Sequence, residues 1–180
     1  VNKNIVMKFH NNTKDEPRLF IQFFDENKNL IALQGRAFGN EEPKYYTLKV
    51  KEDNHKIYGL DRLDKTRHVY VVEGPIDSLF LDNCIAVAGA SFDVPQVEQF
   101  KDDCTIVFDN EPRNKELVKQ IEVMVNKGYR VCLWNDSIRE KDINDMIIAG
   151  KTPLTIHTLI EHNSAKGAEA IAKFNLWRKI

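Results

Sequence analysis

The acidic residues with the most informative spacing follow two short apolar runs. Glu73 ends the run at residues 69–72, and Asp109 and Glu111 follow the run at residues 104–108. Side chains two residues apart in an extended chain point the same way, so Asp109 and Glu111 can project to one side. Crowded carboxylates repel one another, and one of them stays protonated unless a cation lies among them. Oxygen ligands of this kind suit Mg²⁺ or Mn²⁺, and the pattern therefore predicts a divalent-metal site.

The residues around Glu73 predict a strand, a tight turn and a helix. The strand covers residues 68–72, and Gly74 and Pro75 follow Glu73 directly. Glycine permits a sharp turn, and proline suits the first turn of a helix. Apolar residues then recur at helical spacing as far as Phe80, with Asp77 among them. Glu73 should lie at the carboxyl end of its strand, where open α/β sheets bind their ligands.

Further strands and helices alternate after this unit. Strands are predicted at 84–88, 104–108 and 129–134. Asp93 is expected to cap a helix over 94–100, and Pro112 to open one whose apolar stripe runs over 117–125 and ends at Gly128. This alternation predicts an α/β fold with a mostly parallel central sheet flanked by helices.

A smaller β-rich part is predicted before residue 68. A short strand is expected at 5–9, and the runs 19–24 and 30–33 predict a hairpin with a loop at 25–29. At the other end, two closing helices are predicted at 152–162 and 165–173, where Gly167 weakens the second prediction. Trp177 is expected to anchor the tail by packing.

Composition limits the alternatives. The 180 residues are 42% hydrophobic and 29% charged, which indicates a globular chain, and neither a membrane-length apolar stretch nor a signal peptide is visible. A cytoplasmic setting is therefore expected, and the initial valine suggests a fragment or a processed chain. The three cysteines form no Cys-x-x-Cys pair, so no zinc site is predicted and buried, reduced cysteines are expected. The histidines have no metal or catalytic spacing, and neither a nucleophile constellation nor a glycine-rich phosphate loop is visible.

The net charge of −1 does not by itself indicate a nucleic-acid partner, but the charges are unevenly distributed. Residues 73–111 hold nine acids and one base, Lys101. An acidic centre fits a metal site flanked by phosphate contacts, and an ordinary mixed surface would explain the charges equally well.

The paired acidic motifs resemble a known domain. Glu-Gly-x-x-Asp at 73–77, with an acidic pair after a later strand, is similar to the Toprim domain of DnaG-type primases, topoisomerases and some nucleases. The string Asp-Asn-Glu-Pro-Arg-Asn-Lys-Glu at 109–116 is most similar to the primases of T-even-like bacteriophages. The resemblance spans about residue 18 to the C-terminus. It implies a Toprim domain at 68–150, preceded by the N-terminal subdomain of a primase RNA polymerase core at 1–67 and followed by a helical segment at 151–180.

The resemblance also implies a role for several residues. The order of the hairpin, Gly35-Arg36, Pro43-Lys44-Tyr45 and residues 58–60 is similar to the DnaG-type catalytic core, whose small subdomain lines a groove for template and nucleotide. By this resemblance nucleotide phosphates are expected to bind Arg36, Lys44, Arg113 and Lys115. Residues 141–146 resemble the third acidic motif. Asp142 is its expected metal ligand, and either Asn144 or Asp145 takes the second position. Glu111 stands where the wider family usually has aspartate.

The implied activity is that of a DNA primase, a nucleotidyltransferase that makes short RNA primers on single-stranded DNA for phage replication. Ribonucleoside triphosphates would be its substrates, Mg²⁺ or Mn²⁺ its cofactor, and a hexameric replicative helicase its partner, in the host cytoplasm. The implied catalytic residues are Glu73, Asp109 and Glu111, with Asp77 and Asp142 as further metal ligands; Glu73 as a general acid or base is an alternative. Because primases of this type normally carry a zinc module before the core, weak or no activity is expected of this chain alone. Two other functions stay open, a Toprim nuclease or topoisomerase fragment and a non-catalytic module that binds helicase or template.

Overall fold

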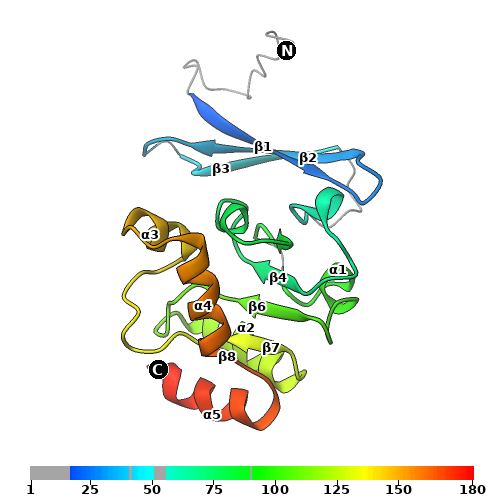
Figure 1. Cartoon of the computed structure of the whole chain (residues 1–180). Helices are drawn as coiled ribbons and strands as arrows, with labels where there is room; N and C mark the ends of the chain where they lie inside the picture. Colours follow the sequence, from blue (N-terminus) through cyan, green and yellow to red (C-terminus); the bar gives the residue numbers. More distant parts are fainter. Residues whose placement is uncertain (1–16, 41, 51–55, 90) are drawn as a thin grey trace.

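The computed structural model describes residues 17–40, 42–50, 56–89 and 91–180. They form a small antiparallel sheet that lies beside a larger α/β body (Figure 1). The strand predicted at 5–9 lies outside the described residues. Within the described ranges, no helix is both long and apolar enough to cross a bilayer.

The small sheet contains the predicted hairpin. Its strands are β1 (Arg18–Phe24), β2 (Leu30–Ala37) and β3 (Tyr45–Lys49), in the order β1-β2-β3. The Asp25 carboxylate closes the hairpin loop, because its Oδ1 accepts hydrogen bonds from the backbone N–H groups of Asn27 and Asn29 at 3.0 and 2.8 Å. On the body side Phe23 is fully buried, with its ring centroid 5.7 Å from that of Tyr58 in an edge-on contact. Tyr58 in turn bridges to Ala86, so this segment connects the two sheets.

The larger sheet is mostly parallel, as predicted. Its order is β5-β4-β6-β7-β8, and the four parallel strands are β4 (Val69–Val72), β5 (Cys84–Ala86), β6 (Cys104–Val107) and β7 (Arg130–Cys132). The antiparallel edge strand β8 (Ser164–Ala165) was not predicted, because two residues carry no recognisable alternation. All three cysteines are free and buried, as expected.

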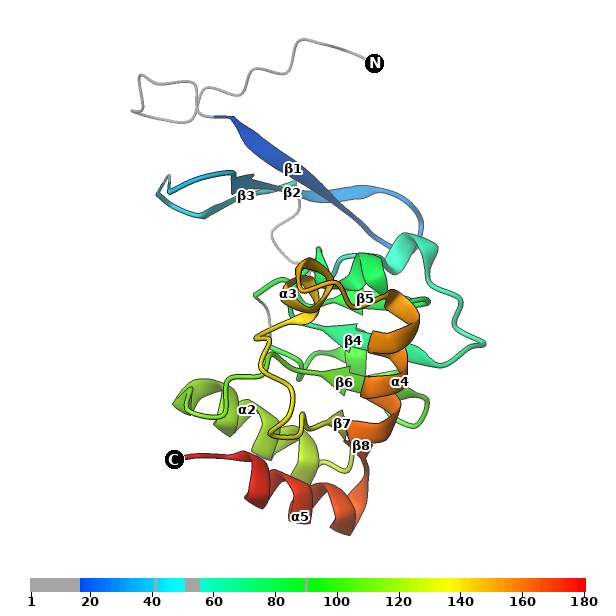
Figure 2. The same cartoon turned by 60° about the vertical axis from the view of Figure 1, so that its left-hand side comes forward.

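Helices cover both faces of this sheet (Figures 1 and 2). Alternate strand residues face opposite ways, so Val69 and Val71 join the core with α1 (Pro95–Glu98), α2 (Lys115–Asn126) and α5 (Gly167–Trp177). Tyr70 and Val72 face the other core, with α3 (Ile143–Ile148) and α4 (Pro153–Asn163). Trp177 is buried in the first core, as the packing prediction requires. Gly167 has φ = 63° at the start of α5, a conformation that glycine adopts readily.

The helix predicted after Pro75 is wrong. The segment forms only the 3₁₀ turn η2 (Asp77–Phe80), and Leu79 is 60% exposed. Leu81 is already extended and β5 begins at Cys84, so the crossover leaves no room for an α-helix. A second 3₁₀ turn, η1 (Leu60–Arg62), precedes β4.

Two predicted helix starts also differ from the structure. Val94, not Asp93, is the N-cap residue of α1, and the Asp93 carboxylate instead pairs with Lys127. Pro112 does not open a helix. Instead α2 starts at Lys115, because the Asn114 side chain accepts hydrogen bonds from the backbone N–H groups of the first helical turn, at 3.1 and 3.3 Å.

Removing this cap gives a stability prediction. The Asn114→Ala variant should lower the free energy of unfolding by about 1 kcal/mol, since it leaves N–H groups of α2 without their side-chain acceptor. Asn114→Ser keeps a capping oxygen and should cost only a fraction of that. Urea unfolding followed by circular dichroism measures both values. Equal losses in the two variants would show that the cap does not stabilise α2.

Candidate metal and phosphate site

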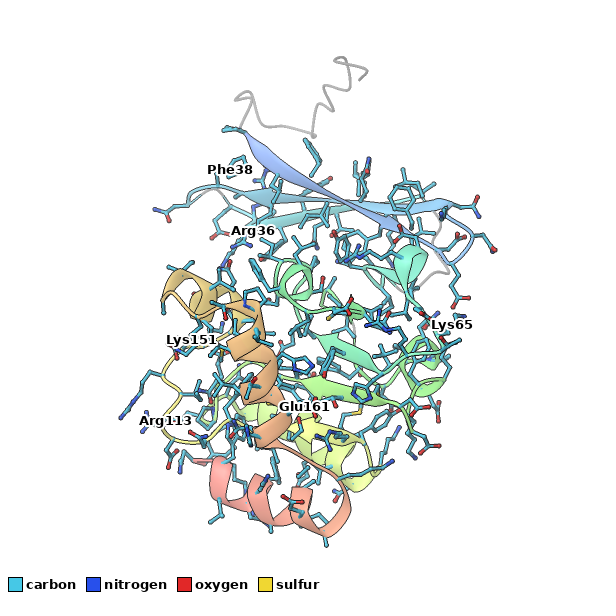
Figure 3. The ribbon with its side chains drawn as sticks, viewed as in Figure 1. Arg36, Phe38, Lys65, Arg113, Lys151 and Glu161 are labelled. Atoms are coloured by element: carbon cyan, nitrogen blue, oxygen red, sulfur yellow. The ribbon has the colours of Figure 1, made fainter. Side chains whose placement is uncertain are left out.

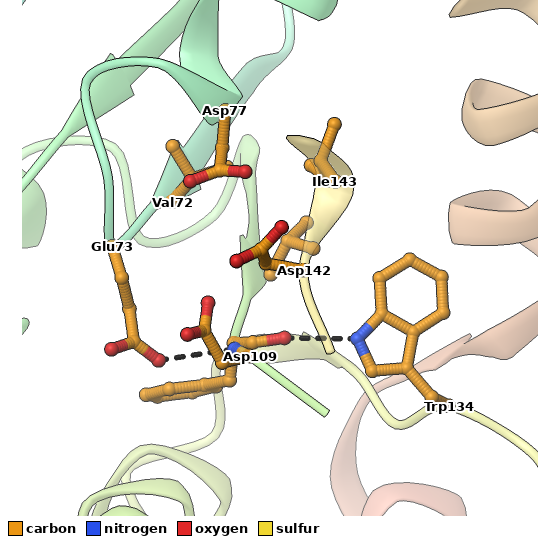
Figure 4. A pocket seen from close by; sticks show the side chains of 9 residues that line it. Val72, Glu73, Asp77, Asp109, Trp134, Asp142 and Ile143 are labelled. Atoms are coloured by element: carbon orange, nitrogen blue, oxygen red, sulfur yellow. Dashed lines mark hydrogen bonds between the residues drawn. The ribbon is translucent and has the colours of Figure 1, made fainter. Parts of the chain in front are cut away.

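The carboxylates predicted to share a site come from neighbouring strands of the larger sheet. β4 and β6 are parallel neighbours with Val72 opposite Val107, so the residues that follow them emerge at the same edge. There Glu73 Oε1 accepts a hydrogen bond from the backbone N–H of Asp109 at 3.0 Å (Figure 4). The structure therefore brings Glu73 and Asp109 together at the carboxyl end of the sheet.

Two further carboxylates reach this place from helical segments. Asp77 lies in η2, and its Oδ1 accepts a hydrogen bond from the backbone N–H of Asn144 at 2.8 Å. Asp142 is the N-cap of α3, and its Oδ1 accepts from the backbone N–H of Asp145 at 2.7 Å. A pocket joins the four carboxylates, and its lining residues are Val72, Glu73, Asp77, Val107, Phe108, Asp109, Trp134, Asp142 and Ile143 (Figure 4).

Gly74 shows why the Glu-Gly-x-x-Asp spacing suits this pocket. A Cβ atom added to Gly74 would collide with Oδ2 of Asp77. The glycine has no positive φ here, so its value lies in this close approach rather than in the turn that the sequence suggested. Any side chain at position 74 would force the Asp77 carboxylate to shift from the position it has here.

Burial raises the pKa values of Glu73, Asp77 and Asp109. Burial, together with the charges of Glu73 and Asp77, raises the pKa of Asp109 to about 8. Burial also raises the pKa of Asp77 to about 6, against the opposing hydrogen bond from Asn144. The pKa of Glu73 is raised by burial as well, although the hydrogen bond from Asp109 opposes the shift. The pocket therefore disfavours several negative charges at once unless a cation compensates them.

Lys141 supplies one positive charge at the rim of the pocket. Its Nζ lies 3.7 Å from Oδ2 of Asp109 and 3.3 Å from Oε2 of Glu111. Burial lowers the pKa of Lys141, but the charges of Glu111 and Asp109 outweigh it and the net shift is upward. Asp109 and Glu111 thus face the same cation. Glu111 does not line the pocket, and its side chain is 36% exposed against 19% for Asp109.

The side-chain oxygens at this edge of the sheet are of the kind that binds a hard divalent cation. All are carboxylate oxygens, which Mg²⁺ and Mn²⁺ prefer, and a bound cation would compensate negative charge that burial disfavours. No three acidic, histidine or cysteine side chains within the described residues already form a complete group for a metal ion. Mg²⁺ typically uses one or two protein carboxylates and completes its shell with water and substrate phosphates, so a full protein cage is not required.

The basic residues predicted to bind phosphate lie on separate elements. Arg36 on β2 is opposite Tyr45 on β3, and Arg36 Cζ and Lys44 Nζ each lie 5.9 Å from the centroid of the Tyr45 ring. Arg113 lies in the turn after Glu111, and Lys115 is the first residue of α2. Figure 3 shows Arg36 at the small sheet and Arg113 away from it, beside the larger body. The structure therefore groups Arg36 with Lys44 and keeps Arg113 apart.

Three residues at this site were missed as contributors by sequence reasoning. They are Lys141, described above, Asn110 and Trp134. Trp134 donates from its indole Nε1 to the carbonyl oxygen of Phe108 at 2.9 Å and so holds the end of β6 (Figure 4). A buried indole N–H needs an acceptor, but the sequence does not show which one it reaches.

Asn144 and Asp145 contribute backbone hydrogen bonds, and neither lines the pocket.

The protonation of Asp109 predicts how pH changes stability. The folded chain without metal holds a proton on Asp109 up to about pH 8, whereas an unfolded aspartate loses it near pH 4. The folded state therefore binds more protons over this range, and the free energy of unfolding should fall as pH rises from 7 to 8.5. Thermal melts in EDTA would show a midpoint that decreases by a few degrees, and saturating Mg²⁺ should flatten this slope. A midpoint that rises over the same range would contradict the raised pKa.

Comparison with known proteins gives one sequence relative and a consistent fold. No family model matches the chain. The chain is 41% identical over 168 residues to the DNA primase of Enterobacteria phage T4, a match that covers 92% of this chain and 48% of that protein. The chain thus spans about half the length of the curated relative it matches. This finding confirms the resemblance that the acidic motifs predicted.

Among solved structures, the chain is similar to a DNA primase domain from Pseudomonas aeruginosa, with 20% identity and a TM-score of 0.67 over 86% of this chain and 53% of that one. It is also similar to a DnaG primase catalytic domain bound to single-stranded DNA, with 16% identity and a TM-score of 0.64 over 88% and 54% of the two chains. The α/β fold with its preceding small sheet is therefore the fold of these catalytic cores, as predicted.

Proposed function

We infer that this chain is the catalytic core of a DNA primase of the T-even phage type, which joins ribonucleotides into short primers on single-stranded DNA. One observation carries the inference. Both acidic motifs of a chain 41% identical to a phage primase deliver their carboxylates to one edge of a parallel sheet, where Glu73 contacts Asp109. That edge is where α/β sheets bind ligands, and an acidic pocket there suits a metal-dependent transfer of a nucleotide.

Each carboxylate would have one of two roles. Glu73, Asp109 and Glu111 would act at the reacting atoms, and Asp77 and Asp142 would complete the metal site on the side of η2 and α3. Bound there, Mg²⁺ or Mn²⁺ would lower the pKa of a primer 3′-hydroxyl and stabilise charge on the incoming triphosphate. Phosphoryl transfer needs positioning and charge stabilisation more than covalent help, which fits a site without a nucleophile.

The basic residues would bind phosphate groups on either side of this site. Arg36 and Lys44, together at Tyr45, suit the template or triphosphate, and arginine adds a bidentate fork to the point charge of lysine. Arg113 and Lys115 lie two and four residues after Glu111 in the chain and would hold phosphates nearer to the metal. The primase domain solved with single-stranded DNA supports DNA as the template.

We extend the proposal to the setting in which the chain would act. As part of a phage primase the chain would work in the host cytoplasm beside a hexameric helicase. The N-terminal subdomain at 1–67 would contribute Arg36 and Lys44, and the Toprim domain at 68–150 would contribute the carboxylates together with Arg113 and Lys115. Residues 151–180 would form a helical segment.

Synthesis on a single-stranded template tests the proposal. The chain is incubated with labelled ribonucleoside triphosphates, single-stranded DNA and Mg²⁺ or Mn²⁺, and Mn²⁺ binding is measured in parallel by electron paramagnetic resonance. A low yield of short RNA products that require the metal is expected of this core alone. Cleavage of the template would indicate a nuclease instead. A chain that makes no RNA and binds no Mn²⁺ would overturn the proposal in favour of a non-catalytic binding module.

A further inference from the structure

The side chain between the two acids of the second motif hydrogen-bonds to two distant parts of the chain, the loop before α3 and the end of α5. Asn110 donates from Nδ2 to the carbonyl oxygens of Ile138 and Glu140 at 3.1 and 3.3 Å. Its Oδ1 accepts a hydrogen bond from the indole Nε1 of Trp177 at 3.3 Å. Its backbone N–H donates to the carbonyl oxygen of Lys141 at 2.6 Å. One residue therefore contacts two segments that lie about 30 and 67 positions further along the chain.

The first of these segments leads into the third acidic motif. Residues 138–141 form a connection without helix or strand between β7 and α3, and Asp142 follows them directly as the N-cap of α3. Asn110 itself lies between Asp109 and Glu111. Its carboxamide thus joins the loop that carries one pair of acids to the loop that carries Asp142.

The second segment is the end of α5. Trp177 is buried against the core beneath the sheet, where α5 packs on α2, and it is anchored there by its ring. Two residues later, the backbone N–H of Lys179 donates to the carbonyl oxygen of Pro112 at 2.9 Å. The end of α5 therefore contacts the loop at 109–112 at two points.

We propose that Asn110 is a positioning residue of the proposed metal site: its carboxamide, supported by Trp177, sets the separation between the loop of Asp109 and Glu111 and the loop of Asp142. The inference rests on the proposed function, because it assigns Asn110 a task in the metal binding of that site. Residues that orient metal ligands from outside the coordination shell commonly change metal affinity 10- to 100-fold when they are removed. Nothing in the acidic motif itself requires an asparagine at this position.

The expected effects of substitution follow from the three hydrogen bonds. Asn110→Ala removes all three side-chain contacts and should weaken Mn²⁺ binding by about 10- to 100-fold. Asn110→Asp has the same shape but turns an oxygen toward the carbonyls of Ile138 and Glu140, so it should weaken binding at least as much. Trp177→Phe keeps an aromatic ring in the core and loses only the donor to Asn110, and a loss of a few-fold is expected.

Mn²⁺ titration followed by electron paramagnetic resonance tests these expectations on the whole 180-residue chain. The matched control is Asn114→Ala, which removes a carboxamide four residues away whose printed hydrogen bonds come from the backbone N–H groups of α2. The backbone hydrogen bond from Asn114 to the carbonyl oxygen of Glu111 stays in this variant. It should lose about as much thermal stability as Asn110→Ala but bind Mn²⁺ as the wild type does. In primer synthesis, raising the Mn²⁺ concentration should rescue Asn110→Ala, since its ligands are all present, whereas it should not rescue Glu73→Gln.

The outcomes separate this inference from the proposed function. If the wild-type chain and the Asn110→Ala variant bind Mn²⁺ with equal affinity, the positioning role is overturned and the proposed metal site stays intact. A loss of affinity shared equally by Asn114→Ala would also overturn it, because general destabilisation would then explain the result. Wild-type chain that binds no Mn²⁺ would overturn the metal site and this role together.

Discussion

Replacement of Glu73 by glutamine is expected to reduce primer synthesis by about 10³-fold or more, a loss of about 4 kcal/mol in transition-state stabilisation. Glutamine keeps an oxygen that can accept the hydrogen bond from the backbone N–H of Asp109, so the loop after β6 should stay in place. What it removes is the negative charge, and with it a ligand for the metal or a general acid–base group at the sheet edge.

The measurement is the rate of RNA synthesis on single-stranded DNA, together with the thermal midpoint of each protein. Glu122→Gln is the matched control, because Glu122 is half exposed on α2 and belongs to no part of the site. It should leave the rate unchanged. Synthesis that survives Glu73→Gln at more than a tenth of the wild-type rate would exclude an essential role for this carboxylate.

The second large effect is expected at Asp109. The Asp109→Asn variant should bind Mn²⁺ about 100-fold more weakly, or not at all, because a negatively charged oxygen ligand of the pocket is gone. Without metal, however, the same variant should be more heat-stable than the wild type at pH 8.5. An ionised Asp109 lies among other carboxylates at that pH, and the neutral amide removes this repulsion.

The lost contact with Lys141 offsets little of this gain, since a partly exposed ion pair at 3.7 Å contributes about 0–1 kcal/mol. Each kcal/mol gained at the transition should raise the midpoint by about 2–4 °C for a chain of this size. Calorimetry in EDTA and Mn²⁺ titration measure the two effects. Asp102→Asn, at a nearly fully exposed side chain, should change neither quantity. A variant that is less stable at pH 8.5 and still binds Mn²⁺ would show that Asp109 is an ordinary structural acid.

Much of this site could be predicted from the sequence, because the strands that lead to Glu73 and Asp109 show as local patterns. The apolar runs before Glu73 and Asp109 are long enough to indicate strands, and an acid directly after a parallel strand must emerge at the carboxyl edge of the sheet. The stripe of α2 and the hairpin of β1 and β2 are equally local, since their periodicity is 3.6 and 2 residues. The periodicity of apolar residues and the acids that follow the strands were therefore enough to predict the α/β fold. They also gave the first three candidate ligands, Glu73, Asp109 and Glu111.

Contacts between distant segments decided the rest. The apolar spacing that indicates a helix after Pro75 gives only the turn η2, because only three residues separate the end of η2 from β5, which must pair with β4. Asp77 and Asp142 come together only because η2 packs against α3. The contact is far along the chain, since Asp77 accepts its hydrogen bond from Asn144, 67 positions later. Lys141 and Trp177 reach the loop at 109–112 in the same non-local way. Such contacts depend on how the whole sheet packs against its helices. The hydrophobic pattern of a single stretch of the chain does not show which distant stretch it will contact.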